Sequence, residues 1–222
     1  MAKFNGPKIV TDGLVLCLDA ANPKSYSGSG TTWTDMSGLG NNGTLKNGPT
    51  FNANNAGSIV FDGSDDNVDV SSSSSLNFTD VISLSCWFNF TVLPDGELGL
   101  FRKTNQWQLG LSNSNTIRCL IGTNLTTGWT TGNDVSYTFS TNTWYNMVMT
   151  YNGSNMLIYV NNSLVKTATV TGSIVTDGTK VQIGYHNRIL NGKISNCSIY
   201  NRALTAAEIQ QNFNATRYRF GI

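Results

Sequence analysis

The chain has 222 residues, a formal net charge of +1, and charged side chains on only 12% of its residues. This length suits a single β-rich domain, and the lack of any Lys/Arg run argues against a nucleic-acid-binding face. No apolar run approaches the roughly 18 residues of a membrane-spanning helix, so we expect no membrane insertion.

Short apolar runs between turn signals predict many antiparallel strands joined by hairpins. Asn-Gly and Asp-Gly pairs mark the turns, for example at residues 62–63, 152–153 and 191–192. In chain order, the predicted strands are 58–61 (SIVF), 67–70 (NVDV), 82–90 (ISLSCWFNF), 98–103 (LGLFRK), 106–111 (QWQLGL), 116–121 (TIRCLI), 144–151 (WYNMVMTY), 156–160 (MLIYV), 163–170 (SLVKTATV), 180–185 (KVQIGY) and 192–200 (GKISNCSIY).

One helix is predicted, and it follows the last strand. Thr205 as N-cap and Glu208 three residues later have the spacing of a capping box. Ile209 and Phe213 lie four residues apart, on the face that we expect to dock on the edge of the sandwich.

The four cysteines are widely spaced and form no CxxC pair. Because the chain also has a single histidine, we expect no zinc site. Cys86, Cys119 and Cys197 lie in strand-like apolar runs, which predicts free thiols buried in the core.

We divide the chain into an N-terminal arm (1–13), one domain (14–213) and a C-terminal tail (214–222). The tail contains Arg217, Tyr218, Arg219 and Phe220. Charged and aromatic side chains of this kind are enriched at interfaces, so we predict that the tail docks on a partner protein.

Several motifs occur in a characteristic order. The front half contains LDAANPKSY (18–26), TWTDMSGLGNNGTL (32–45), GSIVFDGSDDNV (57–68) and ISLSCWFNF (82–90). The back half contains WYNMVMTYNGSNMLIYVNNSLV (144–165), IGYHN (183–187) and LNGKISNCSIYNRALTAAEIQQNF (190–213). This order resembles LamG-like (concanavalin A-like) jelly-roll domains. The resemblance implies an all-β, two-sheet antiparallel sandwich with one short C-terminal helix, in agreement with the predicted elements.

A second resemblance concerns the whole protein. LCLDAANPKSY (16–26) and the ending NATRYRFGI (214–222), together with an N-terminus that shows no apolar signal-peptide core, resemble virion proteins of tailed bacteriophages. This implies synthesis in the host cytoplasm without a signal peptide. It also implies a place on the virion surface as a head decoration or a fibre or appendage component. The implied partners are other virion structural proteins and glycans, and a homo-oligomer is compatible with this placement.

Four aspartates fall within FDGSDDNVDV (61–70). The spacing is not that of an EF-hand loop, which closes with a glutamate. In NVDV, Val68 and Val70 should face the core, and the residues between them should face water. We therefore interpret the aspartates as turn residues whose carboxylates point in different directions. The alternative is a calcium ion bound by Asp62, Asp65 and Asp66.

The related pentraxins sharpen the question of a metal ion. There, an acidic loop before the last strand supplies much of a calcium site, helped by an Asp-Asn pair in an earlier hairpin. The matching segments here, YHNR (185–188) and KTNQW (103–107), hold no carboxylate. Arg188 and Lys103 would repel the ion, so we expect no cofactor, with calcium as the alternative that the three aspartates leave open.

We expect no enzymatic activity. Glycoside hydrolysis by the usual route needs two carboxyls that flank the scissile bond, and the glucanases of this superfamily place glutamates on one strand. This chain has two glutamates, Glu97 in a predicted loop and Glu208 at the helix cap, and His186 is its single histidine. It has no G-x-S-x-G motif for a nucleophilic serine.

Sugar binding without catalysis needs exposed aromatic faces and neutral hydrogen-bonding groups. Trp33, Trp107 and Trp129 lie in turn-rich contexts and are candidate platforms, whereas Trp87 and Trp144 lie within strands and should pack. Trp107 alternates with leucines, which favours the core, so Trp129 in NLTTGWTTGND (124–134) is the best loop candidate.

The candidate ligand-binding residues, placed at one edge of the sandwich, are Asn105, Trp129, His186, Asn187 and Arg188. Three hypotheses follow: a glycan-binding virion protein, a purely structural virion decoration, and a bacterial surface lectin. Exposed loop tryptophans would favour the first, and burial of all of them would favour the second.

Overall fold

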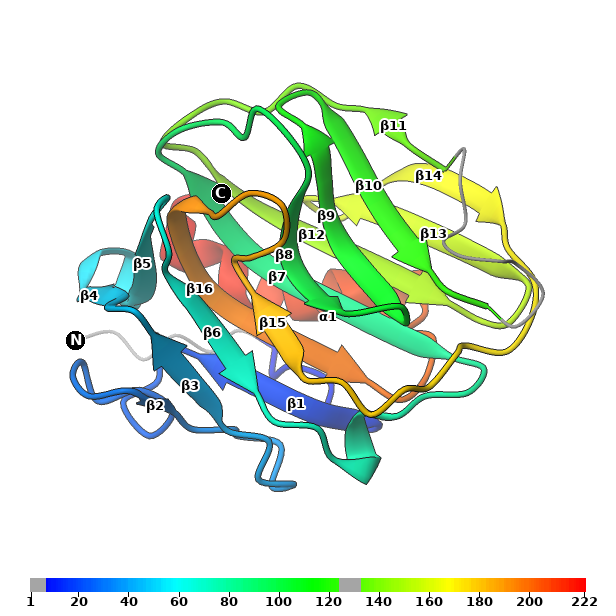
Figure 1. Cartoon of the computed structure of the whole chain (residues 1–222), viewed down its shortest axis with the longest axis horizontal. Helices are drawn as coiled ribbons and strands as arrows, with labels where there is room; N and C mark the ends of the chain where they lie inside the picture. The colour runs from blue at the N-terminus through cyan, green and yellow to red at the C-terminus, as the bar shows by residue number, and fades with distance from the viewer. Residues whose placement is uncertain (1–6, 124–132) are drawn as a thin grey trace.

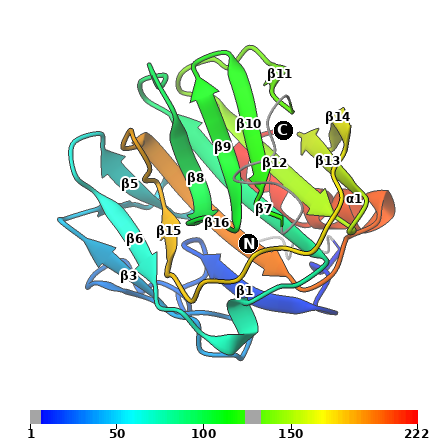
Figure 2. The ribbon, with the colours of Figure 1, turned by 45° about the vertical axis from the view of Figure 1, so that its right-hand side comes forward.

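The computed structural model describes residues 7–123 and 133–222, and their strands form two antiparallel sheets. Sheet A has the strand order β14-β13-β12-β7-β16-β5-β4, with β1 also paired to β16, and sheet B has the order β11-β10-β9-β8-β15-β6-β3-β2. Sheet B lies in front of sheet A in Figure 1, and the turned view in Figure 2 separates the two layers. The predicted two-sheet sandwich with one short C-terminal helix is confirmed.

The strands of sheet A are β1 (Leu14–Asp19), β4 (Thr50–Asn52), β5 (Ser58–Asp62), β7 (Ile82–Phe90), β12 (Trp144–Tyr151), β13 (Asn155–Val160), β14 (Ser163–Thr169) and β16 (Asn191–Tyr200). Those of sheet B are β2 (Thr32–Trp33), β3 (Gly43–Lys46), β6 (Asn67–Val70), β8 (Leu98–Lys103), β9 (Trp107–Asn113), β10 (Thr116–Ile121), β11 (Val135–Ser136) and β15 (Val181–Ile183). The helices are α1 (Ala206–Thr216) and the short 3-10 turns η1 (Asn54–Ala56), η2 (Ser74–Leu76) and η3 (Arg217–Phe220).

The main core lies between the two sheets and follows from alternation along the strands. In β7, Leu84 and Phe88 point into this core and are fully buried. Leu109 and Leu111 of β9 belong to the same buried cluster and enter it from sheet B. The four cysteines are free and buried, as predicted.

The helix α1 packs on the outer face of sheet A, behind it in Figure 1. The predicted capping box is present, because Thr205 Oγ1 accepts from the Glu208 backbone N–H and the Glu208 carboxylate accepts from the Thr205 N–H. Ile209 and Phe213 are buried on one side of the helix, as predicted, but this side packs on a face of sheet A and not on the edge of the sandwich. Among the described residues, no helix has the length and apolar character needed to cross a membrane.

The C-terminal tail packs against its own domain. Arg219 Nη1 lies 2.8 Å from Asp19 Oδ1, and both side chains are mostly buried. The Phe220 ring stacks on Trp87 at 4.2 Å and lies 4.6 Å from Trp144, centroid to centroid. The prediction that Arg219 and Phe220 dock on a partner protein is therefore wrong, because the chain's own sheet A already covers them.

The other two tail residues are more open. The Arg217 guanidinium lies over the Phe213 ring, 5.9 Å from its centroid. Tyr218 is 46% exposed. Docking through Arg217 and Tyr218 stays a prediction.

Candidate functional site

Three loops meet at one edge of the sandwich, at the upper left of Figure 1. They are residues 62–66 between β5 and β6, residues 91–97 between β7 and β8, and residues 184–190 between β15 and β16. Backbone hydrogen bonds tie the second loop to the third, from Arg188 N to Glu97 O (3.0 Å), and to the start of β16, from Thr91 N to Asn191 O (2.9 Å). We call this region the loop edge.

The loop edge contains a pocket of about 290 Å³ between the second and third loops. Arg188 forms one wall, and its Nε lies 2.6 Å from Asp95 Oδ1. Leu93 and Ile189 add apolar surface, and Gly63 of the first loop completes the rim. The volume is at the lower limit of small-ligand pockets, roughly 300 Å³.

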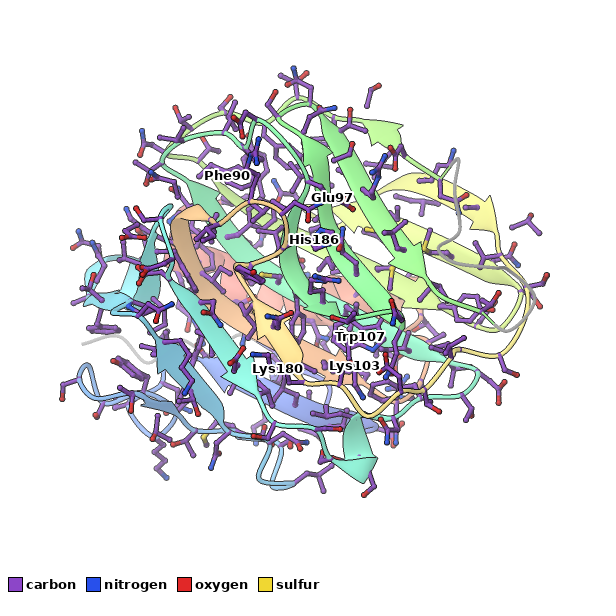
Figure 3. The ribbon with its side chains drawn as sticks, in the orientation of Figure 1. Phe90, Glu97, Lys103, Trp107, Lys180 and His186 are labelled. Atoms are coloured by element: carbon purple, nitrogen blue, oxygen red, sulfur yellow. The ribbon has the colours of Figure 1, made fainter. Side chains whose placement is uncertain are left out.

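Beside this pocket, a network of polar side chains is centred on Glu97. Its carboxylate accepts from Gln108 Nε2 at 3.3 Å and from Asn187 Nδ2 at 3.4 Å. His186 Nδ1 lies 3.7 Å from Glu97 Oε2, and Arg118 Nη1 lies 3.8 Å from Oε1. We call these five residues the Glu97 cluster; Figure 3 labels Glu97 and His186 side by side in front of β8 and β9.

Strand alternation places this cluster on the outer face of sheet B. Gln108 lies between Trp107 and Leu109, which both point into the core, so its side chain points outward. It pairs with Arg102 of β8 in the ladder. Arg118 of β10 points the same way, and Asp134 fixes it through two hydrogen bonds of 3.0 and 2.7 Å.

Two facing glycines let the third loop lie directly over this sheet. Gly99 and Gly110 are opposite each other in β8 and β9. A Cβ on Gly99 would lie 2.8 Å from the carbonyl oxygen of Tyr185, and one on Gly110 would collide with the carbonyl of Leu98. A larger residue at Gly99 would therefore push away the segment that carries His186, and one at Gly110 would push away the paired strand β8.

Charges around the Glu97 cluster balance, whereas the first loop of the loop edge adds the carboxylates of Asp62, Asp65 and Asp66. Arg102, Arg118 and Arg188 supply three guanidiniums, and Asp95, Glu97 and Asp134 supply three carboxylates. Burial lowers the pKa of His186, the positive charge of Arg102 lowers it further, and Glu97 opposes both effects. The imidazole is therefore neutral at pH 7, and the charged side chains around the Glu97 cluster sum to no net charge.

Three polar atoms of this region are buried without a hydrogen-bond partner in the described part of the chain. They are Gln108 Oε1, Arg102 Nε and His186 Nδ1. Buried polar atoms nearly always have a hydrogen-bond partner in folded proteins. Each of these unpaired atoms, called orphan atoms below, therefore indicates a partner such as a ligand, an ion or an ordered water. The acceptor of Gln108 and the imidazole nitrogen of His186 lie in the Glu97 cluster, and the donor lies on Arg102, the ladder partner of Gln108.

The three aspartates of the first loop converge instead of diverging. Carboxylate oxygens of Asp62, Asp65 and Asp66 lie within 4.8 Å of one another, which corrects the prediction that they point apart. Yet Asp62 Oδ1 accepts the Ser64 N–H at 2.8 Å, and Asp66 Oδ2 accepts the Asp62 N–H at 3.0 Å. Two of the six carboxylate oxygens are thus already used by the turn, and a calcium ion needs six to eight oxygen ligands.

The pKa values of this acidic cluster move in opposite directions. Backbone N–H groups, that of Ser64 first, lower the pKa of Asp62. Burial raises the pKa of Asp66, and the nearby charges of Asp62 and Asp65 raise it further. The fourth aspartate, Asp69, is separate and pairs with Lys180 at 2.8 Å.

The structure brings together His186, Asn187 and Arg188 but not Asn105. Asn105 follows the far end of β8, about 20 Å from Glu97 at roughly 3.3 Å per strand residue, and its side chain bonds to Asp177. A single site containing both is therefore wrong. Trp129 lies outside the described residues.

The structure also changes the interpretation of two tryptophans and of Lys103. Trp33 and Trp107 are fully buried, so neither is an exposed platform for a sugar ring. Lys103 is also fully buried, and its Nζ donates to Leu76 O at 3.0 Å and to Asn77 Oδ1 at 2.6 Å. Its ammonium group is therefore committed to η2, and its predicted repulsion of a metal ion is unsupported.

The sequence analysis missed Glu97, Gln108, Arg102 and Arg118 as site residues. One signal was available, because Gln108 interrupts the run Trp107-Gln108-Leu109 at the outward position of a buried strand. No local signal connects it to Glu97 or to His186, since strand pairing creates that contact.

A sequence profile described as the concanavalin A-like lectin/glucanases superfamily matches residues 62–210, and the chain belongs to this family. A search of curated proteins gives no match.

Solved structures of the same fold include several toxin domains. The binding domain of Paraclostridial Mosquitocidal Protein 1 aligns with a TM-score of 0.73 and 18% identity over 92% of this chain and 52% of that one. The binding domain of botulinum neurotoxin DC in complex with SialylT aligns with a TM-score of 0.71 and 19% identity over 94% and 52%. This chain thus spans about half the length of those domains.

A carbohydrate-active protein supplies a full-length match. Domain 4 of AbnA, a GH43 extracellular arabinanase from Geobacillus stearothermophilus, was solved in complex with arabinotriose. It aligns with a TM-score of 0.70 and 16% identity, over 90% of this chain and 98% of that domain. At these identities the likeness establishes the fold.

Proposed function

We propose that this protein is a non-enzymatic, lectin-like domain that binds neutral glycans at the loop edge. The observation that carries the proposal is the set of orphan polar atoms on Gln108, Arg102 and His186. A sugar hydroxyl both donates and accepts hydrogen bonds, so one ligand class pairs with all three. The balanced charge around the Glu97 cluster favours a neutral ligand there over an ionic one.

We further propose that the protein acts on the virion surface of a tailed bacteriophage. The segments LCLDAANPKSY (16–26) and NATRYRFGI (214–222) support this placement by resemblance. Many copies on one particle would convert weak binding at single sites into strong attachment, because linked sites raise the effective concentration.

A purely structural decoration is the second candidate. Its support is the burial of Trp33, Trp87, Trp107 and Trp144, which leaves no exposed tryptophan platform among the described residues. A structural role needs only a stable, nearly uncharged shell, and the sandwich provides one.

The deciding experiment is a glycan and bacterial-envelope array probed with the protein displayed in many copies. If the loop edge binds glycans, H186A and R188A should each weaken binding about tenfold, the cost of one good hydrogen bond. Lys24→Ala, in the exposed turn after β1, is the matched control and should bind normally. The bound glycan should be recovered uncleaved.

Saturable binding that both variants retain would remove the loop edge from the proposal. Binding to no component of the array would favour the structural decoration. Release of sugar products would contradict the non-enzymatic assignment.

A further inference from the structure

A second cavity lies on the opposite side of the molecule, on the outer face of sheet A. It has a volume of about 380 Å³. The N-terminal arm, α1 and the C-terminal tail surround it, with Ile9, Ala215 and Arg219 on its walls. We call it the sheet A pocket; its residues are distinct from those of the loop edge.

The floor of the sheet A pocket is polar. It is formed by Ser85 of β7, Asn146 of β12, and Asn196 and Ser198 of β16. These side chains are at most 9% exposed. Where a helix packs on a sheet the interface is ordinarily apolar, as it is around Ile209 and Phe213 in this same layer. Neutral amides and hydroxyls beside an open volume therefore indicate a ligand site.

The floor is held rigidly by the central strands. Trp87 of β7 is directly opposite both Asn146 and Asn196 in the ladder. Asn146 Nδ2 donates to Ser85 Oγ at 3.2 Å, and Ser198 Oγ donates to Asn196 Oδ1 at 3.3 Å. Groups fixed in this way lose little conformational entropy when a ligand binds.

The walls are also anchored, from three separate segments. Asn212 Oδ1 of α1 accepts the Val10 N–H of the arm at 2.7 Å, and the Tyr200 hydroxyl donates to Val10 O at 3.0 Å. Gln211 Nε2 donates to Lys8 O at 2.8 Å. The arm is thus tied to the helix across the pocket, which makes the cavity a built feature of the fold.

The charges that line the sheet A pocket favour a neutral ligand. The Asp19–Arg219 ion pair neutralises itself at the wall, and Lys8 is the remaining charged lining residue, an exposed one. The Trp87 indole already stacks on Phe213 and Phe220, so it offers no free face for an aromatic ring. Recognition must therefore come from amide and hydroxyl groups.

We infer that the sheet A pocket binds one neutral, polyhydroxylated ring, the size of a single sugar or cyclic polyol. This inference is independent of the loop edge, since the two sites lie on opposite faces and share no residue. Each can fail while the other stands.

The test is amide NMR titration with glucose, galactose, N-acetylglucosamine and myo-inositol, each alone. At least one probe should shift the amide signals of Ser85, Asn146 and Asn196 saturably. Ala215→Leu, which fills the pocket from the helix side, should abolish the shifts. Ala207→Leu is the matched control, because it makes the same change at an exposed position of α1.

Circular dichroism of the Ala215→Leu variant should first show an intact fold. As a second variant, Asn196→Ala removes the floor amide without filling the space and should weaken binding at least tenfold. Absence of shifts with all four probes, or shifts that persist in Ala215→Leu, would overturn the inference and leave a water-filled cavity. H186A should leave these shifts unchanged, because His186 lies at the loop edge. The NMR titration therefore tests the sheet A pocket separately from the glycan array, which tests the loop edge.

Discussion

At the residue scale, Glu208 joins three parts of the chain. Its carboxylate closes the capping box of α1 and receives Arg202 through bonds of 2.9 and 2.7 Å, while Arg202 also reaches Asp12 of the arm. Arg202 is the first cause that lowers the pKa of Glu208, to about 2 from its ordinary 4.5. The carboxylate therefore stabilises the fold fully above pH 4.5 and loses that effect as pH falls towards 2.

We expect Glu208→Ala to lower the free energy of unfolding at pH 7 by about 1 to 2 kcal/mol, a cap plus a partly exposed ion pair. The difference from wild type should shrink as pH falls from 4.5 to 2. Urea unfolding at several pH values measures both effects, with Thr205→Ser as a control that keeps the cap oxygen. A difference independent of pH would show that the ionised carboxylate contributes nothing.

For Asp66, ionisation has the opposite effect on the stability of the fold from that of Glu208. Burial first, and then its acidic neighbours, raise its pKa above the ordinary 3.8, so its charge destabilises the folded state once pH rises through that range. Without a bound ion, Asp66→Asn should melt at or above wild type at pH 7, and that advantage should vanish near pH 3. Melting curves with EDTA and with calcium chloride test this directly. A calcium-dependent rise in wild type that Asp66→Asn lacks would establish the metal site that the turn geometry disfavours.

At the element scale, the hairpin of β8 and β9 depends on close backbone approach. Gly110→Ala would push a Cβ into the Leu98 carbonyl, so we expect a loss of ~2–3 kcal/mol in stability, as for an overpacked core. Gly178→Ala is the control, because Gly178 has a φ of 71° and open space around it. That control should cost only about 1 kcal/mol, through its left-handed backbone. Equal losses in denaturant unfolding would show that the hairpin can relax.

Element prediction from sequence succeeded where alternation extended over several residues. The nine-residue strand β7 was predicted with its observed bounds, and Val68 and Val70 of β6 face the core as expected. The prediction missed β1, β2, β3, β4 and β11. Strands β2 and β11 have two residues each, too few to show periodicity, and β1 is a continuous apolar run without alternation. The Glu97 cluster was missed for another reason, since Gln108 and His186 each reach Glu97 only through the pairing of β8 with β9 and β15.

At the scale of the whole molecule, sheet A has two different faces. One face meets sheet B in the main apolar core, and the other is covered by α1, the arm and the tail. This second layer is part apolar, around Trp87 and Phe213, and part polar, around the sheet A pocket. The tail therefore stabilises the chain's own sheet A. The sequence had instead predicted that the tail contacts another protein.

A substitution of Phe220 tests whether the tail stabilises its own domain. Phe220 is 9% exposed, and its ring stacks on Trp87 and lies tilted against Trp144, so Phe220→Ala should cost about 3 kcal/mol, near the lower end for a buried phenylalanine. Because the cavity would lie against two tryptophans, their fluorescence should also change in the native state. Ile222→Ala, at a 41% exposed position two residues on, is the control and should have little effect. If Phe220→Ala leaves both stability and fluorescence unchanged, the tail is detached in solution and free to dock elsewhere.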